Sequence, residues 1–276
     1  MAFENEIRKY EELRQRYQSL IINKMDREEY IKYNEVLFST HSCAIEGNSF
    51  SVDDTRELKE KGLGMIPAGK TLFEAFEMLD HFEAYEYMIQ HLQHPLDENL
   101  LKEINKRVTL HTLRSPDAIP GEYTTTDMAA GDTVFGDHEE LIARVPQLLE
   151  STERTIQTVI QARNADETQK EAVHAPHPMV LAARFHGFYE YLHPFRDGNG
   201  RTGRLISNYI LLRLGHPLLV IPSDCRNEYI SALRMIRTEA TDEHLIHFFF
   251  KMATDRMEQE IKQKEANTKR FTTFLF

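Results

Sequence analysis

The sequence is poor in cysteine and contains no tryptophan. Cys43 and Cys225 are the only cysteines among 276 residues. Two thiols cannot form the disulfide framework of a small secreted domain, so the sequence predicts a reducing, cytoplasmic compartment. No apolar run approaches the roughly 20 residues that span a bilayer. The opening MAFENEIRKYEEL is charged and lacks the apolar segment of a secretory signal, so we expect neither a membrane anchor nor a cleaved leader.

Positive charge is also in the minority. Lysine and arginine total 33 against 44 acidic residues, which gives a net charge of −11. Because phosphate backbones select basic surfaces, this balance argues against nucleic acid as the main partner. Three arginines nevertheless gather in one short segment, Arg196, Arg201 and Arg204, where an anionic small molecule could bind.

Helical periodicity dominates, and apolar strands do not alternate with helices. Hydrophobic residues make up 41% of the chain, enough for a full core. The apolar spacing and the capping residues predict helices over 7–20, 26–47, 51–62, 71–92, 97–113, 139–164, 178–192, 202–214, 227–239 and 243–266. Residues 115–138 are rich in glycine, proline and β-branched residues and predict a loop and a short hairpin. A polar connection is expected over 164–176. The predicted class is all-α with one β-hairpin.

In the helix expected over 71–92, four apolar residues mark the predicted buried side: Phe73, Phe76, Leu79 and Phe82.

The segment HPFRDGNGRTGR, residues 193–204, contains GNGRTG, which spells the dinucleotide-binding pattern G-x-G-x-x-G. A dinucleotide turn needs a buried hydrophobic strand before its first glycine. Here HPFRD, with a proline and charged residues, stands in that place. Asp224 and Glu228 lie near the spacing of a ribose ligand, but such a match is common in an acidic chain. We therefore reject the dinucleotide interpretation.

The same glycines suit a different anion site. Gly198 and Gly200 allow main-chain N–H groups to approach an anion closely, just before a helix whose N-terminus carries partial positive charge. Arg201 and Arg204 are three residues apart on that helix. Two guanidinium groups beside a helix N-terminus suit a polyphosphate better than a single phosphate.

Two further residues complete a catalytic set. Asp197 would repel a phosphate unless a cation lay between them, and Mg²⁺ bound by one carboxylate and phosphate oxygens meets that requirement. His193 lies outside the glycine turn and can act as general base for an incoming hydroxyl. The residues alone therefore predict phosphoryl or nucleotidyl transfer from a nucleoside triphosphate with Mg²⁺.

Residues 193–204 match the motif HPFx[DE]GNGRxxR of the Fic family (Fic/Doc, Fido fold) at every specified position. The segments FHGFYEYLHPF, LISNYILLRLGHPLL and RNEYISAL also resemble the core of that family. The resemblance implies an N-terminal helical region over 1–98, a Fic core over 99–255 and a C-terminal helix end and tail over 256–276. The implied activity is AMPylation, in which AMP moves from ATP to a hydroxyl of a target protein and pyrophosphate is released.

The resemblance also assigns roles. His193 would deprotonate the target hydroxyl, Phe195 would hold the loop in the core and Asp197 would bind Mg²⁺. The residues implied to bind ATP are Gly198, Asn199, Gly200, Arg201 for the β-phosphate, Arg204 for the γ-phosphate and Tyr229 beside the adenine. A flap over 124–135 would pair with the target protein as an added strand. Where the family often has an arginine before the flap, this chain has Thr124, so we predict no particular target residue.

A second motif precedes the core. SCAIEGN, residues 42–48, resembles the inhibitory pattern [ST]xxxE[GN] of the same family. The resemblance implies that Glu46 pairs with Arg204, while Ser42, Gly47 and Asn48 shape and steady the end of the inhibitory helix. A carboxylate on that guanidinium would take the place of the γ-phosphate, which predicts a self-inhibited enzyme.

Other functions remain open at this stage. Relatives with this fold transfer other nucleotides, phosphocholine or phosphoryl groups, and Glu46 could instead align a water that removes AMP. The kinase-like Doc branch carries lysine where Gly200 stands here. A catalytically silent adaptor that binds peptides through the flap is the alternative outside enzymes. The terminal aromatic segment, residues 271–276, is a candidate surface for a homodimer.

Overall fold

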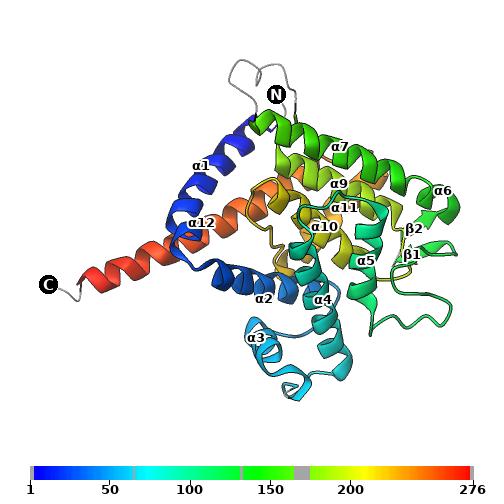
Figure 1. The fold of residues 1–276 in the computed structure, drawn as a ribbon, viewed down its shortest axis with the longest axis horizontal. Coiled ribbons are helices and arrows are strands. Elements are labelled where there is room, and N and C mark those ends of the chain that lie inside the picture. The colour runs from blue at the N-terminus through cyan, green and yellow to red at the C-terminus, as the bar shows by residue number, and fades with distance from the viewer. Residues whose placement is uncertain (1–2, 65, 131–132, 165–174, 274–276) are drawn as a thin grey trace.

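Helices form most of the part of the chain that the computed structural model describes, residues 3–64, 66–130, 133–164 and 175–273 (Figure 1). The long helices are α1 (Glu4–Leu20), α2 (Arg27–Ile45), α3 (Val52–Lys61), α4 (Leu72–Gln90), α5 (Glu98–Thr109), α7 (Val145–Asn164), α9 (Pro178–Leu192), α10 (Asn199–Arg213), α11 (Arg226–Thr238) and α12 (Glu243–Thr273). The short elements are α6 (His138–Ile142), η1 (Ile22–Lys24), η2 (Gly62–Gly64), η3 (Ser223–Cys225), β1 (Met128–Ala130) and β2 (Thr133–Gly136). The predicted all-α class with one hairpin is confirmed.

α9 and α10 form the centre of the molecule. They pack against each other, and α10 also contacts α2, α4 and α5. Nearly every residue of α10 from Asn199 to Leu211 is buried, including its two arginines. Since a buried arginine must find acceptors or an anion, this position already marks α10 as the functional helix.

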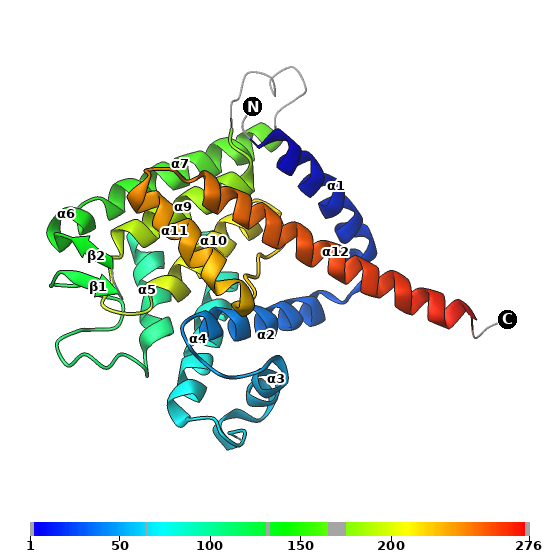
Figure 2. The ribbon, with the colours of Figure 1, turned by 180° about the vertical axis from the view of Figure 1, so that it is seen from behind.

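The N-terminal helices surround this centre from two sides. α1 runs along α12, and the two views agree that α12 extends well beyond the body (Figures 1 and 2). α2, α3 and α4 pack together over a small separate core of Cys43, Phe50, Leu58, Ala75, Met78 and Phe82. Side-chain caps begin these helices: Asp26 accepts from the N–H of Glu28 at 2.8 Å, and Ser51 and Thr71 each start a capping box. The C-terminal end of α2 is thereby brought against α10.

Several predicted boundaries were wrong. α10 begins at Asn199 rather than Thr202, because Gly198 is its left-handed N-cap residue. The helix predicted over 97–113 ends at Thr109. The helix predicted over 139–164, with Pro146 as a kink or first-turn residue, is two helices, α6 and α7. Pro146 lies in the first turn of α7, as predicted, and has no N–H to continue a helix from α6.

The predicted buried side of α4 was also incomplete. Phe82 is buried, whereas Phe73, Phe76 and Leu79 are only half-buried. Three polar residues, Glu77, Asp80 and His81, lie deeper than those three apolar residues. Each of them has a polar partner across the helix interface: Arg201, His111 and Ser39 respectively.

α12 continues to Thr273, so residues 256–273 belong to the same helix as 243–255. Most of the polar connection predicted over 164–176 lies outside the described residues, as does the end of the aromatic segment 271–276. The homodimer surface therefore stays a prediction. No helix within the described ranges has both the length and the apolarity to cross a membrane.

Candidate active site

The motif turn between α9 and α10 is fixed by its backbone geometry. His193 ends α9 in the left-handed region, with φ 48° and ψ 55°, and its N–H donates to O of Tyr189 at 2.9 Å. Gly198 starts α10 with φ 74°. A Cβ at this position would lie 2.6 Å from Cγ2 of Thr109. Glycine is therefore required at 198 by conformation and by packing.

Asn199 and Phe195 hold this turn closed. Asn199 donates through Nδ2 to O of Phe195 at 2.7 Å and accepts through Oδ1 from N of Phe195 at 3.0 Å. Phe195 is 1% exposed, and its backbone pairs with Tyr123 ahead of the flap. The turn is a stiff platform that presents the first N–H groups of α10, which have no partners within the helix.

The carboxylate of Glu46 lies at this helix N-terminus. Glu46 ends α2, and Gly47 with φ 109° turns the chain immediately afterwards. A Cβ added at Gly200 would collide with Oε1 of Glu46 and would lie 3.0 Å from Nη1 of Arg204. Since a helix N-terminus attracts anions, Glu46 occupies the place where an anionic ligand would bind.

Arg204 is enclosed by residues 42–48, the predicted inhibitory segment, and by Tyr229. Its Nη2 binds Oε1 of Glu46 at 2.7 Å and the main-chain O of Ser42 at 2.8 Å, and its Nε donates to Oγ of Ser42 at 3.0 Å. Nη1 lies 3.4 Å from the hydroxyl of Tyr229. The side chain is 3% exposed. Burial opposes its charge, but Tyr229 and Glu46 raise the pKa of the guanidinium above its ordinary value.

Tyr229 is 1% exposed, and its hydroxyl also lies 2.6 Å from Nε2 of His186. Burial lowers the pKa of His186 to about 4, so the imidazole is neutral at pH 7. The Tyr229 hydroxyl therefore contacts a neutral imidazole on one side and the guanidinium of Arg204 on the other. The structure thus brings together four residues that the sequence named from three separate segments: Ser42, Glu46, Arg204 and Tyr229.

Arg201 is held by a carboxylate that sequence reasoning missed. Its Nη1 lies 2.8 Å from Oε1 of Glu77, and its Nη2 lies 3.4 Å from Oδ1 of Asp197. Asn48 of the inhibitory segment donates through Nδ2 to the other oxygen of Glu77 at 2.8 Å. Burial raises the pKa of Glu77. Its position inside a helix with an apolar pattern gave no local sign of this role.

Contacts with two helices, α4 and α11, fix the position of the end of the inhibitory segment. Asn48 also donates to O of Glu74 on α4 at 3.0 Å, and its Oδ1 accepts from N of Phe50. Arg226 of α11 donates through Nε to O of Ile45 at 2.6 Å, which satisfies a carbonyl at the C-terminal end of α2. The carboxylate of Glu46 is therefore held by a structured helix end rather than by a loose loop.

The flap covers His193. The ring of Phe135, on β2, stacks on the imidazole with centroids 3.9 Å apart and an interplanar angle of 19°. Ahead of β1, the N–H of Thr124 donates to O of Pro194 at 2.8 Å, so the chain enters the flap through a backbone bond to the motif turn. Nδ1 of His193 lies 3.7 Å from Oε2 of Glu190, a second carboxylate that sequence reasoning missed and that is 12% exposed. The spacing of three residues on one helix was the available sign.

Asp197 can accept a cation. Its side chain is 46% exposed. Within the described ranges, the hydrogen bonds to its carboxylate end on Oδ1, from N of Gly198 at 2.5 Å and from Arg201. Oδ2 thus remains for a metal ion beside the anion site, and a single carboxylate that leaves room for phosphate oxygens and water suits Mg²⁺.

A second group of metal-type ligands, Glu11, His177 and His216, joins α1 to the start of α9 and the loop after α10. Nδ1 of His177 accepts the N–H of Met179 at 3.2 Å, so the proton of the neutral ring is on Nε2, which donates to Glu11 at 3.0 Å. Arg14 binds the other oxygen of Glu11 at 2.6 Å. This group presents an N–H rather than a lone pair to a cation, and we assign it a structural role.

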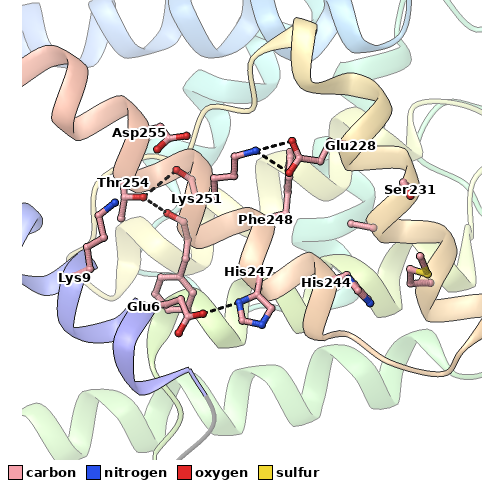
Figure 3. A pocket seen from close by; sticks show the side chains of 13 residues that line it. Glu6, Lys9, Glu228, Ser231, His244, His247, Phe248, Lys251, Thr254 and Asp255 are labelled. Carbon is pink, nitrogen blue, oxygen red and sulfur yellow. Dashed lines mark hydrogen bonds and ion pairs between the residues drawn. The ribbon is translucent and has the colours of Figure 1, made fainter.

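A cavity of about 550 Å³ lies between α1, α11 and α12 and shares no residue with the motif turn (Figure 3). Its lining charges are largely neutralised in pairs. Lys251 lies 2.8 Å from Glu228, and His247 lies 2.8 Å from Glu6. The anion-binding features of the molecule are therefore at α10 and not in this cavity.

The match to a known protein family covers the same part of the chain as the candidate active site. The model of the Fic/DOC family matches residues 95–211, which include the motif turn, the flap and most of α10. Protein adenylyltransferase Fic of Drosophila grimshawi is 31% identical over 201 residues, which are 71% of this chain and 36% of that protein. Protein adenylyltransferase fic-1 of Caenorhabditis briggsae is 28% identical over 222 residues, 79% of this chain and 38% of the relative. The chain thus spans less than half the length of these curated relatives.

Solved structures share the fold. A Fic-domain-containing signalling protein from Bacteroides thetaiotaomicron superposes with a TM-score of 0.74 at 23% identity, over 94% of this chain and 97% of that one. Fic-1 from Caenorhabditis elegans superposes with a TM-score of 0.71 at 24% identity, over 95% of this chain and 73% of that one. The likeness extends beyond the family match to the N-terminal helices.

Proposed function

Because this chain belongs to the Fic/DOC family, we propose that it is a protein adenylyltransferase, which moves AMP from ATP to a hydroxyl of a target protein. The observation that carries the proposal is the motif turn itself. His193, whose backbone is in the left-handed region, lies just before the N-terminus of α10. Glycines leave this N-terminus accessible, and the first turns of α10 carry two buried arginines. That arrangement offers a base next to a polyphosphate site.

In the proposed reaction, His193 takes the proton of the target hydroxyl while its oxygen attacks the α-phosphorus of ATP. The bond from that phosphorus to the bridging oxygen breaks, and pyrophosphate leaves. Arg201 and Arg204 bind the β- and γ-phosphates, and the N–H groups after Gly198 bind phosphate oxygens. Asp197 would hold Mg²⁺, which supplies charge neutralisation of the phosphates when bound.

We further propose that the enzyme inhibits itself. Oε1 of Glu46 sits 2.7 Å from Nη2 of Arg204 and against Gly200, so a γ-phosphate and this carboxylate cannot both use the guanidinium. The buried contacts of Ser42 with Arg204 and of Asn48 with Glu77 support this arrangement. ATP would bind beside Glu46 only in a pose that is not productive.

The remaining parts of the proposal concern partners and place. The division into regions 1–98, 99–255 and 256–276 separates the inhibitory helices from the catalytic core. The target would pair with the flap over 124–135, which carries two described strands and lies on His193 through Phe135. The two free cysteines suit a cytoplasmic compartment. A homodimer through the terminal aromatic segment is part of the same proposal.

Intact-mass analysis of Glu46→Gly with ATP and Mg²⁺ tests the reaction. We expect the protein, as its own target, to gain one adenylyl group, and we expect no gain when His193→Ala is added. The released product separates the alternatives: pyrophosphate indicates AMP transfer, ADP indicates a kinase, and release of AMP from a modified protein indicates removal. Absence of any ATP-dependent mass gain in Glu46→Gly would favour the silent adaptor.

A further inference from the structure

Two buried polar atoms on neighbouring side chains near the motif turn lack a hydrogen-bond partner. Among the described residues, neither Nδ1 of His193 nor Oε1 of Glu190 has one. The other carboxylate oxygen of Glu190, Oε2, lies 3.7 Å from this nitrogen. The two side chains are 16% and 12% exposed, so water has little access to either. Because a carboxylate accepts and a ring N–H donates, a small side-chain movement would join them in a hydrogen bond.

The surroundings keep Glu190 charged. Arg204, on the neighbouring α10, contributes positive charge, and Arg237 of α11 donates to the main-chain O of Glu190 at 3.3 Å. Burial opposes ionisation, but the adjacent His193 side chain and the charge of Arg204 lower the pKa of Glu190 below its ordinary value. The partner offered to His193 is therefore a carboxylate anion.

Gly203 makes room for this carboxylate. A Cβ at 203 would lie 3.0 Å from Oε1 of Glu190 and 2.8 Å from Cδ1 of Tyr189. Gly203 has an ordinary helical backbone, and its position one turn into α10 gives it no part in the glycine turn itself. Its missing side chain is explained by the close approach of α9 and its acidic residue.

Two further features fix the orientation of the His193 imidazole. Phe135 covers one ring face, and the left-handed backbone of His193 sets the direction of the side chain. With Nδ1 towards Glu190, Nε2 is the nitrogen left to take a proton.

We propose that Glu190 is the positioning residue of the catalytic base. Its carboxylate accepts a hydrogen bond from Nδ1–H of His193, holds the ring in the tautomer whose Nε2 is basic, and stabilises the imidazolium that forms when the target hydroxyl gives up its proton. The proton moves from the hydroxyl to Nε2, and Glu190 itself remains ionised. This inference rests on the proposed AMP transfer.

The test compares Glu190→Gln with Glu190→Asp, both in the Glu46→Gly background. The glutamine keeps the size of the side chain but lacks the charge, and we expect kcat for self-modification to fall by about 10²-fold with the KM for ATP unchanged. The aspartate retains the charge and should recover part of the rate. An exposed carboxylate on α7, changed as Glu150→Gln, is the matched control and should behave as the parent.

Nitrogen-15 NMR of the His193 imidazole, assigned with His193→Ala, tests the contact without catalysis. In the Glu46→Gly protein we expect the neutral ring to carry its proton on Nδ1, and we expect the Nδ1–H resonance to shift in Glu190→Gln, where the acceptor is uncharged. An Nδ1–H resonance that is the same in Glu190→Gln and in its parent overturns the proposal. An equal loss of rate and thermal stability in both Glu190 variants also overturns it, because that pattern indicates a purely structural role. If Glu46→Gly shows no AMP transfer, the proposed function fails while the Nδ1–H resonance still decides the role of Glu190.

Discussion

Arg201 and Arg204 lie one helical turn apart on α10, yet two different regions of the molecule hold them. Arg204 is bound by α2, through a carboxylate, a hydroxyl and a main-chain carbonyl. Arg201 forms an ion pair with Glu77 of α4 through Nη1, without the alignment of a hydrogen bond, and within the described residues its Nε has no hydrogen-bond partner. The α2 residues together with Tyr229 therefore give every nitrogen of the Arg204 guanidinium a partner, whereas α4 mainly neutralises the charge of Arg201. This difference supports the proposal that inhibition acts at Arg204, and it leaves Arg201 with capacity to bind an anion.

We expect the largest change in the rate of AMP incorporation when the carboxylate of Glu46, at the end of α2, is removed. Glu46→Gly leaves the buried guanidinium of Arg204 without its carboxylate counterion and opens the N-terminus of α10. Because a buried charge that loses its partner costs up to about 3 kcal/mol, and because ATP can recover that energy by supplying the new partner, we expect the rate of AMP incorporation to rise by on the order of 10²-fold. Labelling with ATP that carries its label on the α-phosphate measures this rate.

Two variants separate charge from helix effects. Glu46→Gln keeps the shape of the side chain and should release most of the inhibition. Glu29→Gln changes an exposed residue of the same helix and should leave the rate at the wild-type level. Equal labelling of wild type and Glu46→Gly would show that the α2 contact does not limit the reaction.

A smaller effect should follow loss of the hydroxyl beside Glu46. Ser42→Ala removes the acceptor of Nε of Arg204 but keeps the main-chain contact at 2.8 Å. A hydrogen bond to a charged group contributes about 1.5 kcal/mol, so we expect activation of about tenfold in the same assay. If Ser42→Ala matched Glu46→Gly in rate, the carboxylate would have no special part in inhibition.

On the α4 side the expected change is in affinity. Glu77→Gln removes the negative charge beside Arg201, so in the Glu46→Gly background we expect ATP with Mg²⁺ to bind about fivefold more tightly. Isothermal titration calorimetry measures the Kd, and Glu83→Gln, an exposed carboxylate of the same helix, is the control. Weaker binding in Glu77→Gln would mean that Glu77 orients Arg201 for the phosphate instead of competing with it.

The two regions also differ in how far the sequence predicts them. The resemblance of two motifs to those of the Fic family implies the Glu46–Arg204 pair, and the structure places those residues in contact. Glu77 could not be found in this way, because its partner is more than a hundred residues away and its own helix reads as apolar. Local rules predict a solvated face for a charged residue, and only the packing of α4 on α10 shows that this one is buried.

Local sequence patterns also fail to predict where some helices begin and end. The helices themselves follow from periodicity and caps, but the first residue of α10 does not. A glycine-rich stretch reads as a loop, whereas Gly198 adopts the left-handed conformation that begins the helix and Gly200 lies inside it. A side chain at either glycine would collide with a packed neighbour, which is Thr109 at Gly198 and the Glu46 carboxylate at Gly200. Both neighbours are distant in sequence, so local patterns do not predict these contacts.

The smallest effect, and the one that separates the two arginines best, is the pH dependence of ATP binding. Burial raises the pKa of Glu77, so in the folded protein this carboxylate takes up a proton at a higher pH than a solvated glutamate does. A raised pKa means that protonation favours the folded state, and this contribution is lost as pH rises through the folded pKa. The protonated side chain is neutral, as glutamine is. In the Glu46→Gly background, the Kd of the protein that retains Glu77 and the Kd of its Glu77→Gln variant should therefore converge as pH falls below neutrality and separate as it rises. Comparing the two proteins at each pH cancels the titration of ATP and of every other group that they share. A ratio of Kd values that stays constant across this range would show that the charge of Glu77 does not reach the phosphate site, and the contrast between the two arginines would then be one of packing alone.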